Sequence, residues 1–287
     1  MARGDAAGVR CRGAPAGDHP PGWPRKLRAV ETLRIERQDG VVSITLDRPE
    51  KRNAINGVMW DELLATFQEI AATPSDRCVV ITGAGGAFCS GADLSGERPE
   101  SERPHQLQVM RHVNNVAVAL HELAQPTIAK VTGVAAGAGA NLAFGCDLIV
   151  ASEEARFSEI FTRRGLSVDF GGTWLLPRLV GLHRAKELAF FADIISAKEA
   201  AEIGLVNRLV PASDIDRFVD DWAQRLASGP PIAMGQTKQM LNRSFEQTLS
   251  QSLDDEAWSQ TVNFSTKDTA EAIDAFLAKR EPRFTGR

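Results

Sequence analysis

Hydrophobic and polar positions alternate in the part of the chain that follows residue 30. Residues 31–37 and 41–46 are runs of alternating or β-branched character, which is typical of strands. Between them, Asp39-Gly40 tolerates the positive φ of a tight turn, so the pattern predicts a hairpin. Apolar residues then recur at helical spacing over 57–72, and the buried run 78–82 predicts the next strand. This order indicates a β-α-β step.

The alternation of strands and helices continues to residue 151. A helix is expected over 105–123, because Gln125-Pro126 ends it, and the apolar run 127–132 predicts a strand. A short helix over 138–144 and a strand over 147–151 complete a further unit. The core is therefore predicted to be α/β.

Helical spacing dominates from residue 172 to the end of the chain. Ser196 with Glu199, and Ser213 with Asp216, have the spacing of helix caps, in which the carboxylate reaches back to an unpaired amide. We divide the chain into a core domain at 31–210 and a C-terminal helical region at 211–287. The expected helices cover 172–179, 183–191, 197–203, 213–226, 232–243, 249–264 and 267–279.

Residues 1–30 differ in composition from the rest of the chain. Ala, Gly and Pro make up half of them, and six basic residues stand against two acidic ones. We expect a disordered extension, since such a segment buries too little apolar surface to fold and lacks the apolar stretch of a secretory signal. Without it the formal charge of −4 becomes −8, which disfavours non-specific binding to nucleic acid.

Composition narrows the class of protein further. With 287 residues, 43% of them hydrophobic, the chain can bury a sizeable core. Charged and polar residues interrupt the apolar region 128–150, so no membrane span is expected. The four cysteines show no CxxC spacing, which favours reduced thiols in a cytoplasmic protein and gives no support for a metal site.

Two glycine-rich segments, 83–93 and 133–141, each follow a strand-like run. Neither offers an obvious nucleophile or metal ligand, so they present mainly backbone N–H groups. Amides from two strand ends could converge on one carbonyl oxygen and stabilise an oxyanion, by about 3–4 kcal/mol per donor at most. The alternative interpretation is that the glycines only permit tight turns and close packing.

Three motifs occur in order: Ile81-Thr82-Gly83 with Phe88-Cys89-Ser90-Gly91-Ala92-Asp93-Leu94, then Gly133-Val134-Ala135-Ala136-Gly137-Ala138-Gly139, then Gly171-Gly172-Thr173-Trp174-Leu175-Leu176-Pro177-Arg178-Leu179-Val180-Gly181. Together with signals at 48–56 and 201–207 they resemble the crotonase superfamily, also called the enoyl-CoA hydratase/isomerase family. The resemblance runs from about residue 31 to the C-terminus. It implies a spiral of β-β-α units with a C-terminal helical layer, and an acyl-CoA whose thioester oxygen is held by the Ser90 and Ala138 amides.

The resemblance also implies where coenzyme A binds. Two of the matching positions, on the last helix, reach the CoA of a neighbouring subunit in relatives, which implies a homotrimer or a dimer of trimers. CoA enters as part of the substrate, so no separate cofactor and no metal is expected. The implied positions are Ala54, Ala92 and Asp93 on the adenine and pantetheine path, Lys51 and Arg52 near a CoA phosphate, Asn141 at the substrate, and Phe276 and Lys279 on the last helix.

Two family positions bear on the reaction. A hydratase of this family uses two glutamates around one water, one as base and one as acid. Asn141 and Phe161 occupy those positions here, and neither an amide nor a phenyl ring exchanges protons at neutral pH. Glu159 lies two residues before Phe161, and this offset makes it a weak substitute.

Asp169, just before the double glycine 171–172, is a better-placed carboxylate. Apolar neighbours could exclude water and tune it toward base function; alternatively, it caps the following helix. In the family this position carries an acid/base aspartate in 1,2-epoxyphenylacetyl-CoA isomerases and some enoyl-CoA isomerases, and a nucleophilic one in aryl-CoA dehalogenases. The motifs look most like the first group, so we expect an acyl-CoA isomerase with Asp169 as proton shuttle.

Other functions stay open at this point. A hydratase with an atypical acid/base set, or a non-catalytic CoA-binding scaffold, would also lack the two glutamates. A Rossmann oxidoreductase is disfavoured because Phe88 takes the last place of the glycine pattern. A serine hydrolase is disfavoured because Cys89-Ser90-Gly91 is not a GxSxG elbow.

Overall fold

The strands expected at the start of the core form a hairpin at one edge of a sheet. The computed structural model describes residues 30–95 and 105–287. β1 (Leu33–Gln38) and β2 (Val41–Leu46) pair antiparallel, and Asp39 and Gly40 between them have positive φ, so the predicted hairpin is confirmed. The extension predicted over residues 1–30 lies outside the described residues, Val30 excepted.

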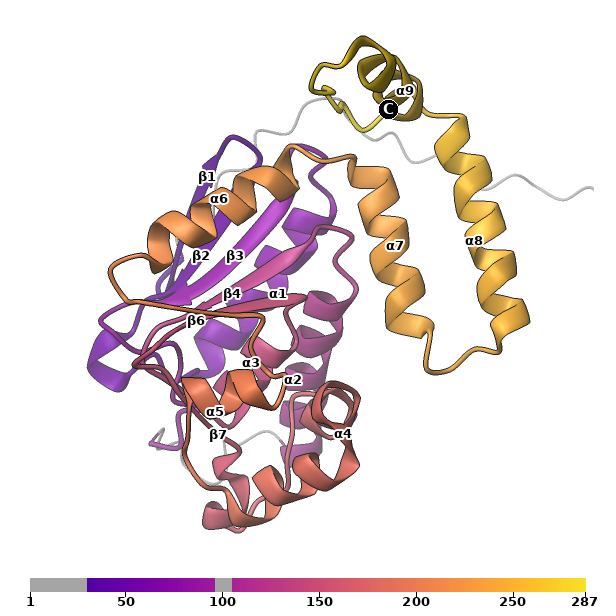
Figure 1. The fold of residues 1–287 in the computed structure, drawn as a ribbon. Coiled ribbons are helices and arrows are strands. Elements are labelled where there is room, and N and C mark those ends of the chain that lie inside the picture. The colour runs from indigo at the N-terminus through magenta and orange to yellow at the C-terminus, as the bar shows by residue number, and fades with distance from the viewer. Residues whose placement is uncertain (1–29, 96–104) are drawn as a thin grey trace, which may run out of the picture.

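The remaining strands of this sheet are parallel. The strand order is β1-β2-β3-β4-β6-β9, and Figure 1 shows β1, β2, β3, β4 and β6 side by side. The predicted α/β core is confirmed, and the short last strand was not expected. The parallel strands are β3 (Cys78–Gly83), β4 (Thr127–Val131), β6 (Leu148–Ser152) and β9 (Arg208–Val210).

Two strands of the large sheet continue, after a short turn, into strands of a second sheet. β5 (Val134–Ala136), which follows β4, pairs parallel with β7 (Arg156–Ser158), which follows β6. β8 (Ile195–Ser196) adds antiparallel to β7. After β5 the chain enters α3 (Ala138–Phe144), so it advances as strand, strand, helix. This is the spiral of β-β-α units that the resemblance implied.

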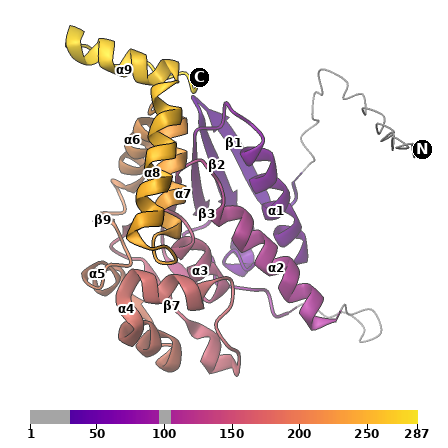
Figure 2. The ribbon, with the colours of Figure 1, turned by 90° about the vertical axis from the view of Figure 1, so that its right-hand side faces the viewer.

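The two faces of the large sheet bind different helices. Val79 and Ile81 of β3 belong to one buried cluster with residues of α1 (Gly57–Ala71) and α2 (Gln106–His121). Cys78 and Val80 point to the other face and pack with α6 (Ile215–Ala227). The alternation follows from the two-residue period of a strand. Figure 2 shows the sheet between these helices.

The helix caps were predicted with mixed success. α5 (Ala197–Glu202) begins with the predicted capping box of Ser196 and Glu199. The prediction at Ser213 is wrong, because α6 begins after Asp214, whose side chain makes no capping hydrogen bond. α4 (Gly172–Phe191) contains the predicted break between two helices, at Gly181 with φ 77° and ψ 160°.

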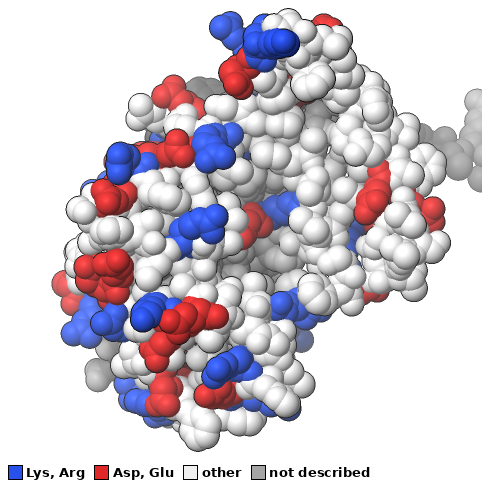
Figure 3. Space-filling model, in the orientation of Figure 1, with Lys and Arg blue, Asp and Glu red and all other residues white. Residues whose placement is uncertain are grey.

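Three C-terminal helices extend beyond the sheet. α7 (Pro231–Arg243) and α8 (Leu249–Phe264) lie side by side, and α9 (Lys267–Ala278) follows them (Figures 1 and 2). α8 has no buried residue and exposes Trp258 and Phe264. In Figure 3 charges of both signs are interspersed over α4 to α6, whereas the surface over α7 is mostly uncharged. None of the helices described here combines the length and apolar character needed to cross a membrane.

We expect Phe67→Ala to destabilise the protein by about 3–5 kcal/mol, because Phe67 is fully buried between α1 and the sheet and its removal leaves a cavity. Val58→Ala, at an exposed position of the same helix, is the control and should change stability by less than about 0.5 kcal/mol. Thermal and denaturant unfolding would measure both. Equal losses in the two variants would contradict the placement of α1.

Candidate active site

The two glycine-rich segments lie directly against each other. Cys89 and Ala135 form a parallel bridge, in which the Cys89 N–H donates to the Val134 carbonyl at 3.0 Å. The Ala136 N–H donates back to the Cys89 carbonyl at 2.9 Å. The predicted convergence of the segments is therefore present, and it brings the start of α3 next to residues 90–92.

Glycine is required at this contact because the backbones approach so closely. A Cβ at Gly139 would lie 2.5 Å from the Cys89 carbonyl oxygen, closer than real Cβ atoms come to any atom. Gly91 has φ 102°, which an L side chain rarely adopts, and its Cβ would lie 3.0 Å from the Ala136 carbonyl oxygen. Close packing and presentation of amides thus occur together here.

One of the two predicted amide donors does not fit the structure. The Ser90 N–H donates to the Arg52 carbonyl at 3.0 Å, so it is already occupied. Two residues on, the Ala92 N–H has no acceptor among the described residues, and the Ala138 N–H at the start of α3 has none there either. A Cβ on Gly91 would lie 3.8 Å from the Ala138 nitrogen, so these two amides are neighbours. The unoccupied pair is Ala92 and Ala138.

The residues predicted around the CoA path differ in their exposure to solvent. Lys51 and Arg52 are exposed at the end of a 3-10 turn (Pro49–Lys51), whereas Ala54 is buried. Asp93 instead binds within the protein: Ser95 hydrogen bonds and the Arg48 guanidinium, at 3.0 Å, lower the pKa of its carboxyl to about 2. Asp93 therefore anchors the segment that carries the Ala92 amide.

Asn53 is a residue of this region that the sequence interpretation did not single out. It is fully buried, and its amide donates to the carbonyls of Ala84 at 2.9 Å and Ala87 at 2.8 Å. These bonds fix the first glycine turn. Its position inside the 48–56 motif was the available signal.

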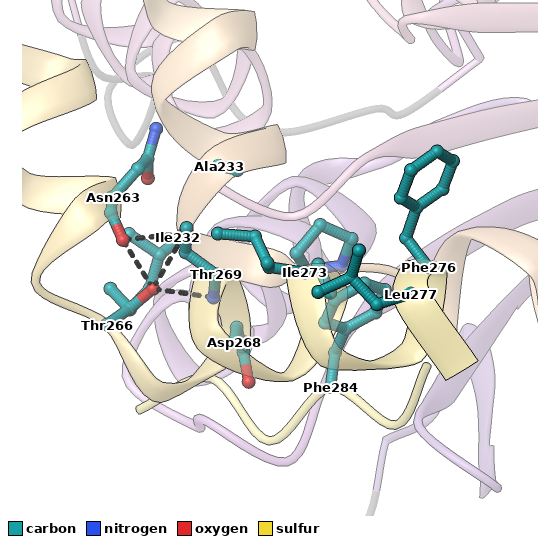
Figure 4. Close-up of a pocket in the computed structure, with 12 residues that line it drawn as sticks. Ile232, Ala233, Asn263, Thr266, Asp268, Thr269, Ile273, Phe276, Leu277 and Phe284 are labelled. Carbon is teal, nitrogen blue, oxygen red and sulfur yellow. Dashed lines mark hydrogen bonds between the residues drawn. The ribbon is translucent and has the colours of Figure 1, made fainter. Parts of the chain in front are cut away.

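Phe276 and Lys279 are not near the two amides within one subunit. They lie at the end of α9, which is at the far end of the C-terminal helices from α4 (Figure 1). Phe276 is 81% exposed and lines a cavity of about 320 Å³ with Ile273, Leu277 and Phe284 (Figure 4). Their predicted contact with CoA would thus require a neighbouring subunit.

Asp169 lies just before α4, and its carboxylate is not used as a helix cap. The N-cap of the helix is Gly171, and the Asp169 carboxylate makes no hydrogen bond to a first-turn amide among the described residues, so the alternative interpretation of Asp169 as a cap is wrong. The Asp169 backbone carbonyl accepts hydrogen bonds from the Gly172 N–H at 3.0 Å and the Asn141 side-chain amide at 2.9 Å. Burial raises the pKa of the carboxyl to about 6, and its Oδ1 has no partner among the described residues.

Glu159 is closer to this centre than the sequence suggested. A 3-10 turn, Ile160–Arg164, begins directly after it. Glu159 is only 2% exposed, and its Oε2 accepts a hydrogen bond from the Asn141 amide at 3.3 Å. Burial raises the pKa of Glu159 to about 8, and the charge of Asp169 adds to the rise, while the Asn141 hydrogen bond opposes it.

Comparison with known proteins identifies the family. The sequence pattern of the enoyl-CoA hydratase/isomerase family matches residues 36–287. A probable enoyl-CoA hydratase of Rhodobacter capsulatus is 41% identical over 259 residues, which cover 90% of this chain and 100% of that protein. The 1,2-epoxyphenylacetyl-CoA isomerase of Escherichia coli is 38% identical over 261 residues, with 90% and 100% coverage.

Solved structures agree with the sequence comparison. The crystal structure of a putative enoyl-CoA hydratase from Streptomyces coelicolor superimposes with a TM-score of 0.87 at 35% identity, covering 95% of this chain and 100% of that one. The chain belongs to the enoyl-CoA hydratase/isomerase family and has the crotonase fold. It is thus an acyl-CoA enzyme of that family rather than a Rossmann oxidoreductase or a serine hydrolase.

We expect Gly172→Ala to destabilise the protein by about 1–3 kcal/mol, because the new Cβ would lie 2.5 Å from both polar atoms of the buried Asn141 amide. In an unconstrained helix the same change stabilises, by about 0.5–1 kcal/mol. The control is Thr173→Ala at the next, exposed position. Thermal unfolding measures both, and a Gly172→Ala protein more stable than wild type would contradict the close contact.

Proposed function

We propose that this protein is an acyl-CoA isomerase that moves a proton along the acyl chain through Asp169. The observation that carries the proposal is a partly buried carboxylate with an oxygen that has no partner in the described part of the chain, close to a fold position where family hydratases use a glutamate. The Ala92 and Ala138 amides, rather than Ser90 and Ala138, would hold the thioester oxygen. No cofactor beyond the CoA of the substrate is needed for this chemistry.

The chemistry requires one group that both takes and returns a proton. The Asp169 carboxylate removes a proton from a carbon next to the double bond, and the electron pair moves to the thioester oxygen as an enolate. The two amides stabilise this oxygen, by about 3–4 kcal/mol per donor at most. Asp169 then gives the proton to the other end of the three-carbon unit. A pKa of about 6 leaves most of the carboxylate ready to act as base at neutral pH.

Hydration is the second candidate. Asn141 and Phe161 cannot transfer protons, which disfavours the usual hydratase arrangement. Glu159 and Asp169 are nevertheless two carboxyl groups in one buried cluster, and several relatives are named hydratases. A non-catalytic CoA-binding scaffold is less well supported, because it gives no reason for a partly buried carboxylate whose Oδ1 has no partner among the described residues.

We expect Asp169→Asn to lower kcat for the interconversion of 3-enoyl-CoA and 2-enoyl-CoA by about 10²–10⁴-fold, because an amide cannot accept the proton. Asp220→Asn, an exposed aspartate on α6, is the matched control and should retain wild-type turnover. Chromatography with mass detection measures both products: isomerisation keeps the mass, whereas hydration adds one water. Near-equal turnover of the two variants would overturn the role of Asp169, and rapid water addition by wild type would favour the hydratase.

We also propose that the chain assembles into a homotrimer or a dimer of trimers in the cytoplasm. The support is the apolar surface of α8 and α9, on which Leu249, Trp258 and Phe276 are each more than 70% exposed. A second copy of this chain would cover that surface and supply Phe276 and Lys279 to its CoA site. The buried, unpaired thiols of Cys78, Cys89 and Cys146 suit a reducing compartment.

Light scattering coupled to size exclusion should therefore give three or six times the mass of one chain. Trp258→Asp should shift the protein toward smaller species, because the charge would be desolvated in the contact. Gln260→Asp, exposed on the same helix, is the control and should leave the mass unchanged. A wild-type protein that elutes as a monomer at micromolar concentration would refute the assembly.

A further inference from the structure

Two carboxyl-bearing residues share one buried amide. The Asn141 Nδ2 donates to Glu159 Oε2 at 3.3 Å and to the Asp169 backbone carbonyl at 2.9 Å. Asn141 is fully buried on α3, and Glu159 is nearly so at the end of β7. A single side chain therefore connects Glu159 to the backbone that carries the proposed base.

This cluster contains more acceptors than donors. Asn141 Oδ1, Glu159 Oε1 and Asp169 Oδ1 are all buried and have no hydrogen-bond partner among the described residues. Two ionised carboxylates in such a place would repel each other, and each buried charge without a partner is strongly disfavoured. A proton held on one of the carboxyl groups removes one charge and supplies the missing donor.

No cation neutralises the pair within the described part of the chain. α3 carries no charged side chain. Arg163 on the 3-10 turn pairs with Asp193, Arg156 of β7 donates to backbone carbonyls, and Arg164 is exposed. On α4, Arg178 stacks on Trp174 and lies beside Glu246. Asp169 is the charged group that acts on Glu159.

We propose that Glu159 is a positioning residue for Asp169: it stays protonated during turnover, holds the Asn141 amide that fixes the Asp169 backbone, and limits the pair to one negative charge. This inference rests on the proposed isomerase function. Of the two carboxyl groups, Glu159 is the more buried and keeps its proton to higher pH, which leaves Asp169 as the ionised base.

The arrangement has a consequence for the enolate. When Asp169 takes the substrate proton it becomes neutral, and with Glu159 also neutral the enolate is the one negative charge at the centre. Ionisation of Glu159 would place a second anion beside the enolate. Activity should therefore fall as the pH rises through about 8, and it should rise as the pH increases through about 6, where Asp169 ionises.

The test compares the pH profiles of kcat/KM for wild type, Glu159→Gln and Glu154→Gln. The glutamine still accepts the Asn141 hydrogen bond but cannot ionise, so at pH near 7 its activity should stay within about threefold of wild type. At pH of about 9 it should exceed wild type by about tenfold, because only about a tenth of Glu159 then keeps its proton. Glu154, exposed two residues before β7, is the matched control and should keep the alkaline decline.

A second variant and a second measurement keep the outcome decisive. Glu159→Ala removes the acceptor for Asn141 and should lower kcat more than Glu159→Gln does, with little change in KM. If the role of Glu159 were purely structural, the activities of the two variants would instead fall in parallel with their stabilities. An alkaline decline that persists unchanged in Glu159→Gln would overturn the proposal.

The stability of wild type and Glu159→Gln, measured against pH, tests the pair without any activity. Because the pKa of Glu159 is raised on folding, its contribution to stability is fully present below about pH 4.5 and is lost as the pH rises through about 8. The stability of wild type relative to the variant should fall over this interval and then level off. If this fall is observed but the protein has no isomerase activity, the proposed function is refuted and the protonated Glu159 is still supported. If the stability difference between wild type and Glu159→Gln does not change with pH, the inference about Glu159 is refuted.

Discussion

The structure depends on the close approach of two backbone segments around Cys89 and Ala135. A Cβ at Gly133 would lie 2.0 Å from the Gly86 carbonyl oxygen, and one at Gly139 would lie 2.5 Å from that of Cys89. No other residue type permits such distances. Because α3 begins at this contact, the contact also sets where the Ala138 amide and Asn141 are located. The candidate oxyanion site and the carboxyl cluster are therefore two results of one packing constraint.

Asn141 supplies a hydrogen-bond donor at the position where family hydratases have a carboxylate, which is an acceptor. A carboxylate there could donate neither to Glu159 Oε2 nor to the Asp169 carbonyl, which accept hydrogen bonds from Asn141 in this structure. The Asn141 amide donates to both, at 3.3 and 2.9 Å. A donor at this position thus serves one carboxyl group, that of Glu159, and the backbone of Asp169.

Much of the fold could be predicted from the sequence because its signals are local. The Asp39-Gly40 turn, the Ser196 cap and the break near Gly181 each depend on a few neighbouring residues, and each is present. The short strand β9, which forms by pairing with β6, was missed, and the start of α6 was misplaced.

The candidate site shows the same division. The convergence of the glycine segments followed from the family motifs, but which amide stays unoccupied depends on the hydrogen bond from Ser90 to Arg52, a contact between residues 38 positions apart in sequence. The sequence interpretation gave Glu159 little weight because of its two-residue offset from Phe161, and its hydrogen bond with Asn141, 18 positions away, has no local sequence signal. Asp169 was singled out from its place before Gly171-Gly172 and from the family motifs, whereas its contact with Asn141, 28 positions away, was not predicted.

Helix α8 has sixteen residues and none of them is buried within its own subunit. Isolated helices of this length are only marginally stable in water, since nucleation is costly and tertiary packing supplies most of the stability. Within the described residues α8 packs against α7 and α9, and in the assembly proposed above it would also contact other chains. Dilution of such an assembly would loosen the C-terminal helices before it affects the sheet.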